Sequence, residues 1–222
     1  PANRRASQSE QAFSFGVFLP YEDANDLAFL NIGIPLNICT GRGMTVGMDM
    51  SDTNLVLISG PVGVGKTTLG EELSGTLESA GVAHTFVDLD GLSKTYPRPE
   101  DDRFGEKIAL KNLGAIWTHA FEQGVRNLIV ARVIETHEGA KRIEQAVSAR
   151  RSVVIELGAS DETLLGRVRK REIGTGRAWH ERRALELSGL LKRSGIADVS
   201  VDTDRKSVQT IANELHQQIG WL

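Results

Sequence analysis

The chain has 222 residues, of which 40% are hydrophobic, and these values indicate one domain with a sizeable core and room for a small appendage. Its formal net charge of −3 gives no overall attraction to nucleic acid or to an anionic membrane. The single cysteine, Cys39, excludes an intrachain disulfide and favours a reducing, cytoplasmic location. We expect neither a membrane span nor a secretory signal, because no apolar run approaches ~18 residues and the stretch 13–19 lacks a small-residue cleavage site.

Residues 1–50 differ from the rest of the chain. They show no sustained helical or strand period, and turn-forming glycine and proline residues interrupt them. Met44, Met48 and Met50 cluster just before the first clear strand, and each is a candidate start of translation. We interpret residues 1–50 as a poorly ordered or non-native extension, with a native arm docked on the domain as the alternative, and we place the folded domain at 53–222.

From residue 53 onward, apolar runs of strand type alternate with segments of helical period. Strands are predicted at 54–59, 83–88, 126–133, 152–157 and 198–202. Helices are predicted near 66–80, 106–123, 138–149, 161–171, 178–193 and 205–219. Gly81 and Gly124 lie where helices should end, and Asp161 is a candidate N-cap. The pattern predicts an α/β three-layer sandwich, with a five-stranded parallel sheet and helices on both faces.

The first predicted strand leads directly into Gly-Pro-Val-Gly-Val-Gly-Lys-Thr-Thr at 60–68, a full match to the phosphate-binding (Walker A) motif GxxxxGK[ST]. Leu69, Leu73 and Leu77 follow at helical spacing and complete the strand–loop–helix context that the motif requires. The glycines let backbone N–H groups converge on an anion at the positive end of the helix dipole. The motif predicts a nucleoside triphosphate site made of Gly60, Gly63, Val64, Gly65, Lys66, Thr67 and Thr68.

Two side chains of this loop carry chemistry of their own. Lys66 is expected to reach the β- and γ-phosphates and to act in catalysis. Thr67 is expected to offer its hydroxyl to Mg²⁺ as the metal-binding residue. The predicted cofactors are therefore ATP and Mg²⁺.

The second predicted strand ends in Asp88-Leu89-Asp90. Ligands of open α/β sheets bind beyond the carboxyl ends of the strands, so both carboxylates should lie near the phosphate loop, and period-2 alternation should point them in the same direction. One would accept a proton from a substrate hydroxyl and the other would orient substrate or a Mg²⁺-bound water, and the assignment between them is open. An acidic, solvated turn is the alternative. The DxxG at 88–91 does not indicate a GTPase, because the spacing leaves no room for a switch segment and no NKxD follows.

Three other segments are candidates to border the same edge. The loop 96–104 either passes over the mouth of the site, where Tyr96, Arg98 and Arg103 would contact substrate, or is a solvated connector. After the third strand, Arg132 stands where a motor ATPase would carry Asp, which argues against a hydrolytic motor, and Glu135 is a candidate contact to Mg²⁺ or substrate. The segment 202–208 is placed beside the nucleotide base or simply caps the last helix.

Residues 167–171 contain four basic side chains at the end of a predicted helix, and glycines follow at 174 and 176. Helix C-termini favour basic residues through the dipole alone, which is the simpler explanation. A phosphoryl-transfer enzyme also needs cations around the γ-phosphate, and a hinged basic lid would supply them while it excludes water. We predict a small basic lid and assign Arg169 and Arg171 to catalysis. No aromatic residues interleave with these charges, which disfavours a nucleic-acid patch.

The motif at 60–67, the pair Asp88 and Asp90 and, loosely, the arginines at 167, 169 and 171 resemble the small P-loop kinases of the adenylate-kinase-like group. The likeness covers residues 53–220 and is greatest to kinases of small non-nucleotide substrates such as shikimate, gluconate, adenylylsulfate and chloramphenicol. The chain also looks like uncharacterised actinobacterial proteins of the AAA family ATPase type. The resemblance implies that the acidic pair positions or deprotonates the acceptor hydroxyl. It does not extend to a nucleotide-monophosphate recognition motif.

The sequence therefore predicts an ATP- and Mg²⁺-dependent phosphotransferase, a kinase that acts on a small hydroxylated molecule. The first alternative is a nucleotide-dependent regulatory ATPase or switch that binds a protein partner. The second is an RNA-end kinase that uses the basic run 167–177. The expected partners are ATP and a small-molecule acceptor, with no nucleic acid and no membrane.

Overall fold

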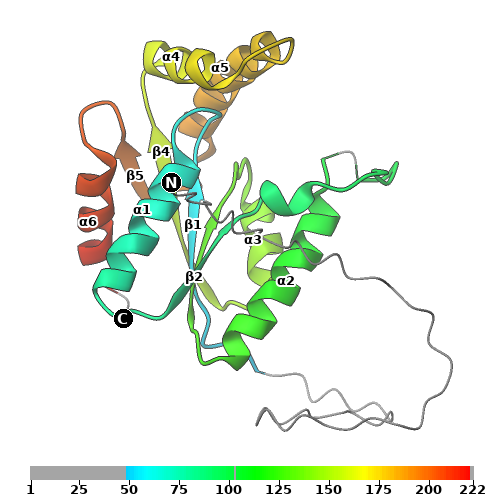
Figure 1. Ribbon diagram of the computed structural model, residues 1–222, viewed down its shortest axis with the longest axis vertical. Coiled ribbons are helices and arrows are strands. Elements are labelled where there is room, and N and C mark those ends of the chain that lie inside the picture. The colour runs from blue at the N-terminus through cyan, green and yellow to red at the C-terminus, as the bar shows by residue number, and fades with distance from the viewer. Residues whose placement is uncertain (1–48, 103, 221–222) are drawn as a thin grey trace, which may run out of the picture. The chain divides into compact units, whose positions relative to one another are not determined.

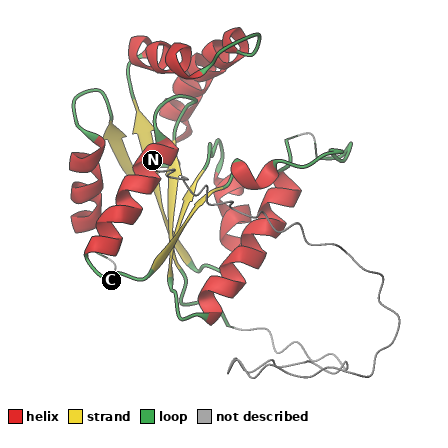
Figure 2. Ribbon diagram, in the orientation of Figure 1, coloured by secondary structure: helices red, strands yellow, loops and turns green. Residues whose placement is uncertain are grey.

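The computed structural model describes residues 49–102 and 104–220, in which strands and helices alternate along the chain (Figures 1 and 2). The strands are β1 (Asn54–Ser59), β2 (His84–Asp88), β3 (Asn127–Ala131), β4 (Arg151–Gly158) and β5 (Val199–Asp202). The helices are α1 (Lys66–Ser79), the short 3₁₀ helix η1 (Gly91–Ser93), α2 (Glu106–Glu122), α3 (His137–Ala146), α4 (Asp161–Arg171), α5 (Arg177–Ser194) and α6 (Val208–Ile219). The interpretation of residues 1–50 lies almost entirely outside the described residues.

All the strands run parallel, in the order β2-β3-β1-β4-β5. The central strand β1 pairs with β3 and β4, so that Ile58 lies opposite Ala131 on one side and Ile155 on the other. Consequently, the loop that follows β1 emerges in the middle of the sheet, where segments from both flanking strands can reach it. The predicted five-stranded parallel α/β fold is confirmed.

The sheet is buried on both faces, with α1 and α6 on one side and α2 and α3 on the other (Figure 1). Alternation along β1 divides its side chains between two cores. Leu55 and Leu57 join the core beneath α2 and α3, whereas Val56 and Ile58 join the core beneath α1 and α6. A strand with apolar side chains on both faces reads as a continuous apolar run, which explains why β1 was recognisable in the sequence.

The helix ends correct two details of the sequence-based expectation. Ser160, not Asp161, is the N-cap of α4, because its hydroxyl accepts from the N–H of Thr163 at 3.2 Å. The last helix begins at Val208 rather than near 205, with Ser207 as its N-cap. Gly81 and Gly124 do end helices, with φ of 72° and 89°, a conformation that costs glycine little.

Helix α1 approaches β2 unusually closely at Gly70. A Cβ added there would lie 2.2 Å from Cε2 of Phe86, far inside contact distance. Only a residue without a side chain therefore lets the Phe86 ring of β2 pack against the α1 backbone. The contact fixes the two elements whose ends carry Thr67 and Asp88.

The described chain is tied to the core just before β1. The Trp117 indole on α2 is fully buried and donates to Thr53 Oγ1 at 3.0 Å, and the Thr53 hydroxyl in turn donates to the Met50 carbonyl at 2.6 Å. Met50 also packs against the core beneath α2 and α3. Within the described residues, the contacts that join the segment before β1 to the core begin at Met50.

Deletion of residues 1–49 is expected to leave a folded domain that binds ATP, because Met50, Thr53 and β1 all remain. Its melting temperature should stay within a few degrees of the parent. Deletion of 1–53 is the matched comparison. It leaves the Trp117 N–H buried without a partner, which should lower the free energy of unfolding by ~1–3 kcal/mol. For a domain of this size, each kcal/mol corresponds to a melting temperature lower by roughly 2–4 °C. Aggregation of the 1–49 deletion would show that the N-terminal segment completes the core.

Candidate functional site

A cleft of about 1390 Å³ opens at the carboxyl ends of the strands. Its walls come from the loop after β1, the ends of β2 and β3, and the helices α4 and α5, which lie beyond the strand ends in yellow and orange in Figure 1. This is the edge at which open α/β sheets bind ligands. The predicted phosphate-loop residues 63–68 line the cleft, as do Asp88, Asp90 and Arg171.

The conformation of the phosphate loop explains its glycines. Gly60 has φ 145°, and a Cβ there would lie 2.6 Å from the Leu157 carbonyl oxygen of β4. Gly63 has φ 82°, and a Cβ there would lie 2.8 Å from a methyl carbon of Val168 on α4. Positive φ and close approach to neighbouring segments both exclude a larger residue, so the loop can curl tightly before α1 begins at Lys66.

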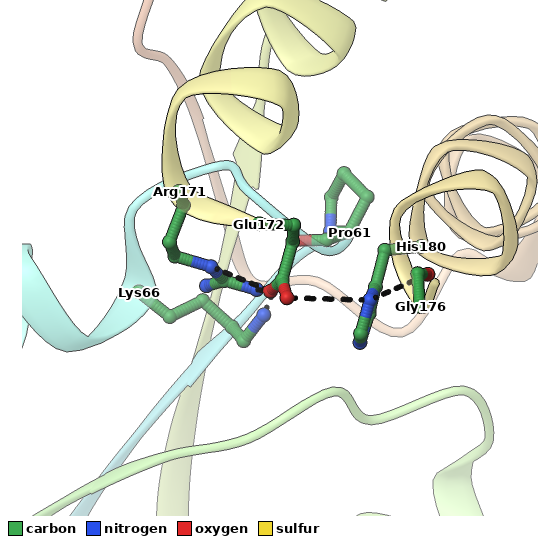
Figure 3. Close-up of polar contacts among 6 residues, drawn as sticks. All are labelled: Pro61, Lys66, Arg171, Glu172, Gly176 and His180. Atoms are coloured by element: carbon green, nitrogen blue, oxygen red, sulfur yellow. Dashed lines mark hydrogen bonds and ion pairs between the residues drawn. The ribbon is translucent and has the colours of Figure 1, made fainter. Parts of the chain in front are cut away.

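Lys66 is held by its own loop. Its ammonium donates to the carbonyl oxygens of Gly60 at 3.0 Å and Pro61 at 3.1 Å. Desolvation lowers the pKa of Lys66 to about 8, an effect that Asp90 and Asp88 oppose and Arg171 reinforces. Figure 3 shows Lys66 close to Arg171. A cation in so desolvated a position lacks a full counter-charge, which a polyphosphate would supply.

The acidic pair lies beside the loop, and its two members have different partners. The Thr67 hydroxyl donates to Asp88 Oδ2 at 2.7 Å, and the Asp90 N–H donates to Asp88 Oδ1 at 3.1 Å. Within the described residues, no hydrogen bond to the Asp90 carboxylate is found. The strand ends at Asp88, so a turn, not strand alternation, brings Asp90 to the cleft. Asp88 is thus engaged with Thr67, and Asp90 keeps its oxygens available.

The basic segment forms the end of α4, the connection 172–176 and the start of α5. Arg171 pairs with Glu172 at 2.9 Å, and Glu172 also lies 3.6 Å from the His180 ring, as Figure 3 shows. Arg169 pairs instead with Glu181 at 3.1 Å and does not line the cleft. The structure therefore brings Arg171, but not Arg169, to the phosphate loop.

Arg167 does not belong to a lid. Its guanidinium donates to the Val64 carbonyl at 2.9 Å and to the Thr203 hydroxyl and carbonyl at 2.9 and 3.0 Å. These bonds connect the phosphate loop to the segment between β5 and α6. The loose match of Arg167 to a lid was wrong, because the residue faces the sheet edge one helical turn before Arg171. Through Arg167, Thr203 of the segment 202–208 is joined to Val64 of the phosphate loop.

Sequence reasoning missed the contribution of α5. Trp179, Arg183 and Glu186 recur at i, i+4 and i+7, and all three line the cleft. Arg183 forms an ion pair with Glu135 and lies 3.7 Å from Glu186. Periodicity of this kind is visible in the sequence, but the pairing of Arg183 with a residue after β3 is not.

Among its described residues, the loop 96–104 reaches the cleft through Phe104. Phe104 lines the cleft, and Tyr96 is 98% exposed and does not. Arg98 and Phe104 line a smaller neighbouring hollow together with Trp179, and Arg103 lies outside the described residues. Tyr96 therefore does not reach the cleft, whereas Phe104 brings the loop to its mouth.

The described residues contain no group of three or more His, Cys, Asp or Glu side chains that could hold a metal ion. The site fits Mg²⁺ in another way, because this ion commonly takes one or two protein ligands together with phosphates and water. The Thr67 oxygen can offer a lone pair to such an ion while its proton remains bonded to Asp88. Mg²⁺ binding through Thr67 remains a proposal.

Fold and site together define a P-loop nucleotide-binding domain. Residues 56–188, more than half of the chain, match the AAA domain family, and the chain belongs to that family. A search of the curated proteins gives no match. No helix in the described part of the chain has the length and apolar character needed to cross a membrane.

Several solved structures share the fold at low sequence identity. The tunicamycin resistance protein of Deinococcus radiodurans is 19% identical, with a TM-score of 0.53, 77% of this chain covered and 97% of that one. A gluconokinase from Sinorhizobium meliloti 1021 is 18% identical, with a TM-score of 0.51 and coverage of 75% and 91%. A sugar kinase from Janibacter sp. HTCC2649 is 16% identical, with a TM-score of 0.53 and coverage of 76% and 95%. The expected likeness in fold to small P-loop kinases is confirmed.

Proposed function

We propose that this protein is an ATP- and Mg²⁺-dependent kinase that transfers the γ-phosphoryl group of ATP to a hydroxyl group of a small molecule. The observation that carries the proposal is the position of Asp90. Its carboxylate accepts no hydrogen bond within the described chain, lines the same cleft as Lys66, and is close enough to influence the pKa of that lysine. A hydrolytic motor has no need of a second, unengaged carboxylate at the end of β2.

The proposed reaction divides the work among these side chains. Lys66 leaves the Gly60 and Pro61 carbonyls for the phosphates, and Thr67 offers its oxygen to the metal ion, kept in orientation by Asp88. The acceptor oxygen bonds to the γ-phosphorus as the bond from that phosphorus to the β–γ bridging oxygen breaks, and the hydroxyl proton passes to Asp90. The bridging oxygen departs with ADP. Bound Mg²⁺ would neutralise charge on the β- and γ-phosphate oxygens.

The remainder of the cleft supports a small acceptor. Beyond Asp90, the lining is mixed, with aromatic Phe104 and Trp179 beside charged Lys94, Arg132 and Glu135. A site that combines aromatic rings with several charged side chains suits a polar, hydroxylated molecule better than a protein segment. The names gluconokinase and sugar kinase, given to two proteins of the same fold, point to the same class of acceptor.

The test is transfer of label from γ-labelled ATP into a small-molecule extract. The expected result is a labelled, protease-resistant product of low mass whose formation requires Mg²⁺ and is lost in Asp90→Asn. Release of label only as inorganic phosphate would support the regulatory ATPase instead. Labelling of added RNA ends, with a strong dependence on salt, would support the RNA-end kinase.

Nucleotide binding is expected to order the segment 165–180. Arg171 lines the cleft and, within the described residues, pairs with its half-buried neighbour Glu172, and Gly174 has φ 115° with open space around it. A triphosphate would compete for Arg171 and draw the segment inward. Hydrogen exchange across 165–180 should slow on addition of ATP and Mg²⁺, whereas exchange in α3 should not change.

Movement of the segment 165–180 toward the nucleotide predicts that two arginine substitutions lower kcat to different extents. Arg171→Ala is expected to lower kcat more than it weakens ATP binding, because its main contact forms at closure. Arg169→Ala should have a smaller effect on kcat, since Arg169 lies on Glu181 outside the cleft. Slow exchange that nucleotide leaves unchanged would show that 165–180 is a fixed helix end.

A further inference from the structure

Arg132 has an exceptional environment among the charged residues of the cleft. It is half-buried and lines the cleft, and its Nη1 atom is shielded from solvent without a hydrogen-bond partner in the described chain. Among residues 49–102 and 104–220, no carboxylate forms an ion pair with its side chain. Removing a guanidinium nitrogen from water without a hydrogen-bond partner costs free energy. We therefore expect a ligand to supply the missing acceptor for Arg132 Nη1.

The other arginines that line the cleft are already engaged. Arg183 is paired with Glu135 and Glu186, Arg171 with Glu172, and Arg167 is bonded to Val64 and Thr203. Arg132 therefore offers the cleft a positive charge that is not paired with any carboxylate of the described residues. An anion that enters the cleft would find an incomplete hydrogen-bond partner there.

The position of Arg132 is set by β3, which lies between the strand that leads to the phosphate loop and the strand that leads to the acidic pair. It follows β3 directly, and its N–H donates to the Ile58 carbonyl at 3.0 Å. Because Ala131 pairs with Asp88 in the sheet, Arg132 lies one residue past Asp88, just after the strand between β1 and β2. Lys66, the loop amides and Arg171, whose charge acts on Lys66, provide for the phosphates. Arg132 remains for the acceptor, beside the acidic pair that is proposed to act on its hydroxyl.

We infer that Arg132 binds an anionic group, a carboxylate or a phosphate, on the acceptor whose hydroxyl receives the phosphoryl group. This inference rests on the proposed kinase function and narrows the acceptor from any small hydroxylated molecule to a hydroxylated anion. The guanidinium holds the anionic group at the end of β3, which turns a hydroxyl of the same molecule toward Asp90. Arg132 would thus determine which hydroxylated molecules are phosphorylated.

The test measures anion binding while the phosphate loop is occupied. The full chain is saturated with AMP-PNP and Mg²⁺, which fills the γ-phosphate position, and inorganic phosphate or acetate is titrated at constant ionic strength in a calorimeter. One anion should bind per chain, and the comparison of phosphate with acetate identifies the preferred group. Arg132→Gln is expected to weaken this binding at least about tenfold, with AMP-PNP affinity unchanged, since bonds to charged groups are the stronger class.

Two further variants control the result. Arg132→Lys keeps the charge and should retain part of the binding, which also covers the case in which Arg132→Gln does not fold. Arg142→Gln removes an arginine paired with Glu106 outside the cleft and should bind like the parent. The inference is wrong if the parent binds neither anion, if Arg132→Gln binds as the parent does, or if Arg132→Gln loses AMP-PNP affinity instead, which would make Arg132 a nucleotide contact.

Different experimental results would overturn the role of Arg132 and the kinase proposal. Anion binding that depends on Arg132, without label transfer from ATP to any small molecule, would retain the anion site and overturn the kinase. Label transfer confined to the fraction of an extract that passes through an anion-exchange resin would retain the kinase and overturn the role of Arg132.

Discussion

Lys66→Ala is expected to abolish phosphoryl transfer while the domain stays folded. Lys66 is the cation placed nearest the converging amides of the phosphate loop, and loss of one preorganised group of this kind typically lowers kcat ~10²–10³-fold, or about 3–4 kcal/mol. Its side chain contributes little to the core, since in the free protein it contacts only the Gly60 and Pro61 carbonyls by hydrogen bonding. The measurement is label transfer from ATP, together with a melting curve.

A comparison with Lys66→Met separates charge from packing, because methionine keeps the length of the side chain. Both variants should be inactive. The free energy of unfolding of the parent should also have a dependence on pH that Lys66→Met lacks. The pKa of Lys66 is about 8 in the folded chain against its usual 10.5, so the unfolded chain binds more protons between these values and stability rises with pH there. Activity above about a tenth of the parent in either variant would refute the assignment of the phosphate loop.

Asp90→Asn is expected to lower kcat by ~10²–10⁴-fold, the usual cost of a lost general base. ATP affinity should change little, because Asp90 is placed to act on the acceptor rather than on the nucleotide. Asparagine keeps the shape of the side chain and of the turn that begins η1, so a loss of activity would report the loss of the proton acceptor. Turnover is measured by label transfer, and ATP affinity by calorimetry.

Asp88→Asn provides the matched comparison, since it changes the neighbouring carboxylate. Asp88 accepts from the Thr67 hydroxyl, so this variant should alter the concentration of Mg²⁺ needed for half-maximal rate. Asp101→Asn removes an exposed carboxylate that pairs with Lys107 and should behave as the parent. Parental turnover in both Asp88→Asn and Asp90→Asn would show that the acidic pair is only a solvated strand end.

The fold was predictable because its signals are local. Residues 55–58 form an apolar run that is buried on both faces, and Leu69, Leu73 and Leu77 mark one helix face, so the strand, the motif and the helix of the phosphate site could be read in order. Shifts at the ends, such as Ser160 in place of Asp161, arise because neighbouring polar residues compete for one cap.

The site was predictable only where its residues follow strands directly. Asp88, Asp90 and Arg132 each stand at a strand end, and the edge of a parallel sheet gathers such residues. Contacts between distant segments were not predictable, because they depend on how helices pack. The pairing of Arg183 with Glu135 and the bonds from Arg167 to Thr203 join residues that nothing in their local sequence connects.

The close packing of Phe86 on Gly70 has a consequence for how acceptor preference can diverge. Because α1 and β2 cannot slide past each other without the ring striking the helix backbone, Thr67 and Asp88 keep their spacing whatever happens elsewhere in the cleft. In the proposed reaction, the residues that would face the acceptor are Lys94, Phe104, those at 132–135 and those at the start of α5, which belong to other elements. Substitutions at these positions can change which acceptor binds while the phosphate loop and Asp88 stay unchanged. These positions are therefore the place to redesign the protein for a new substrate.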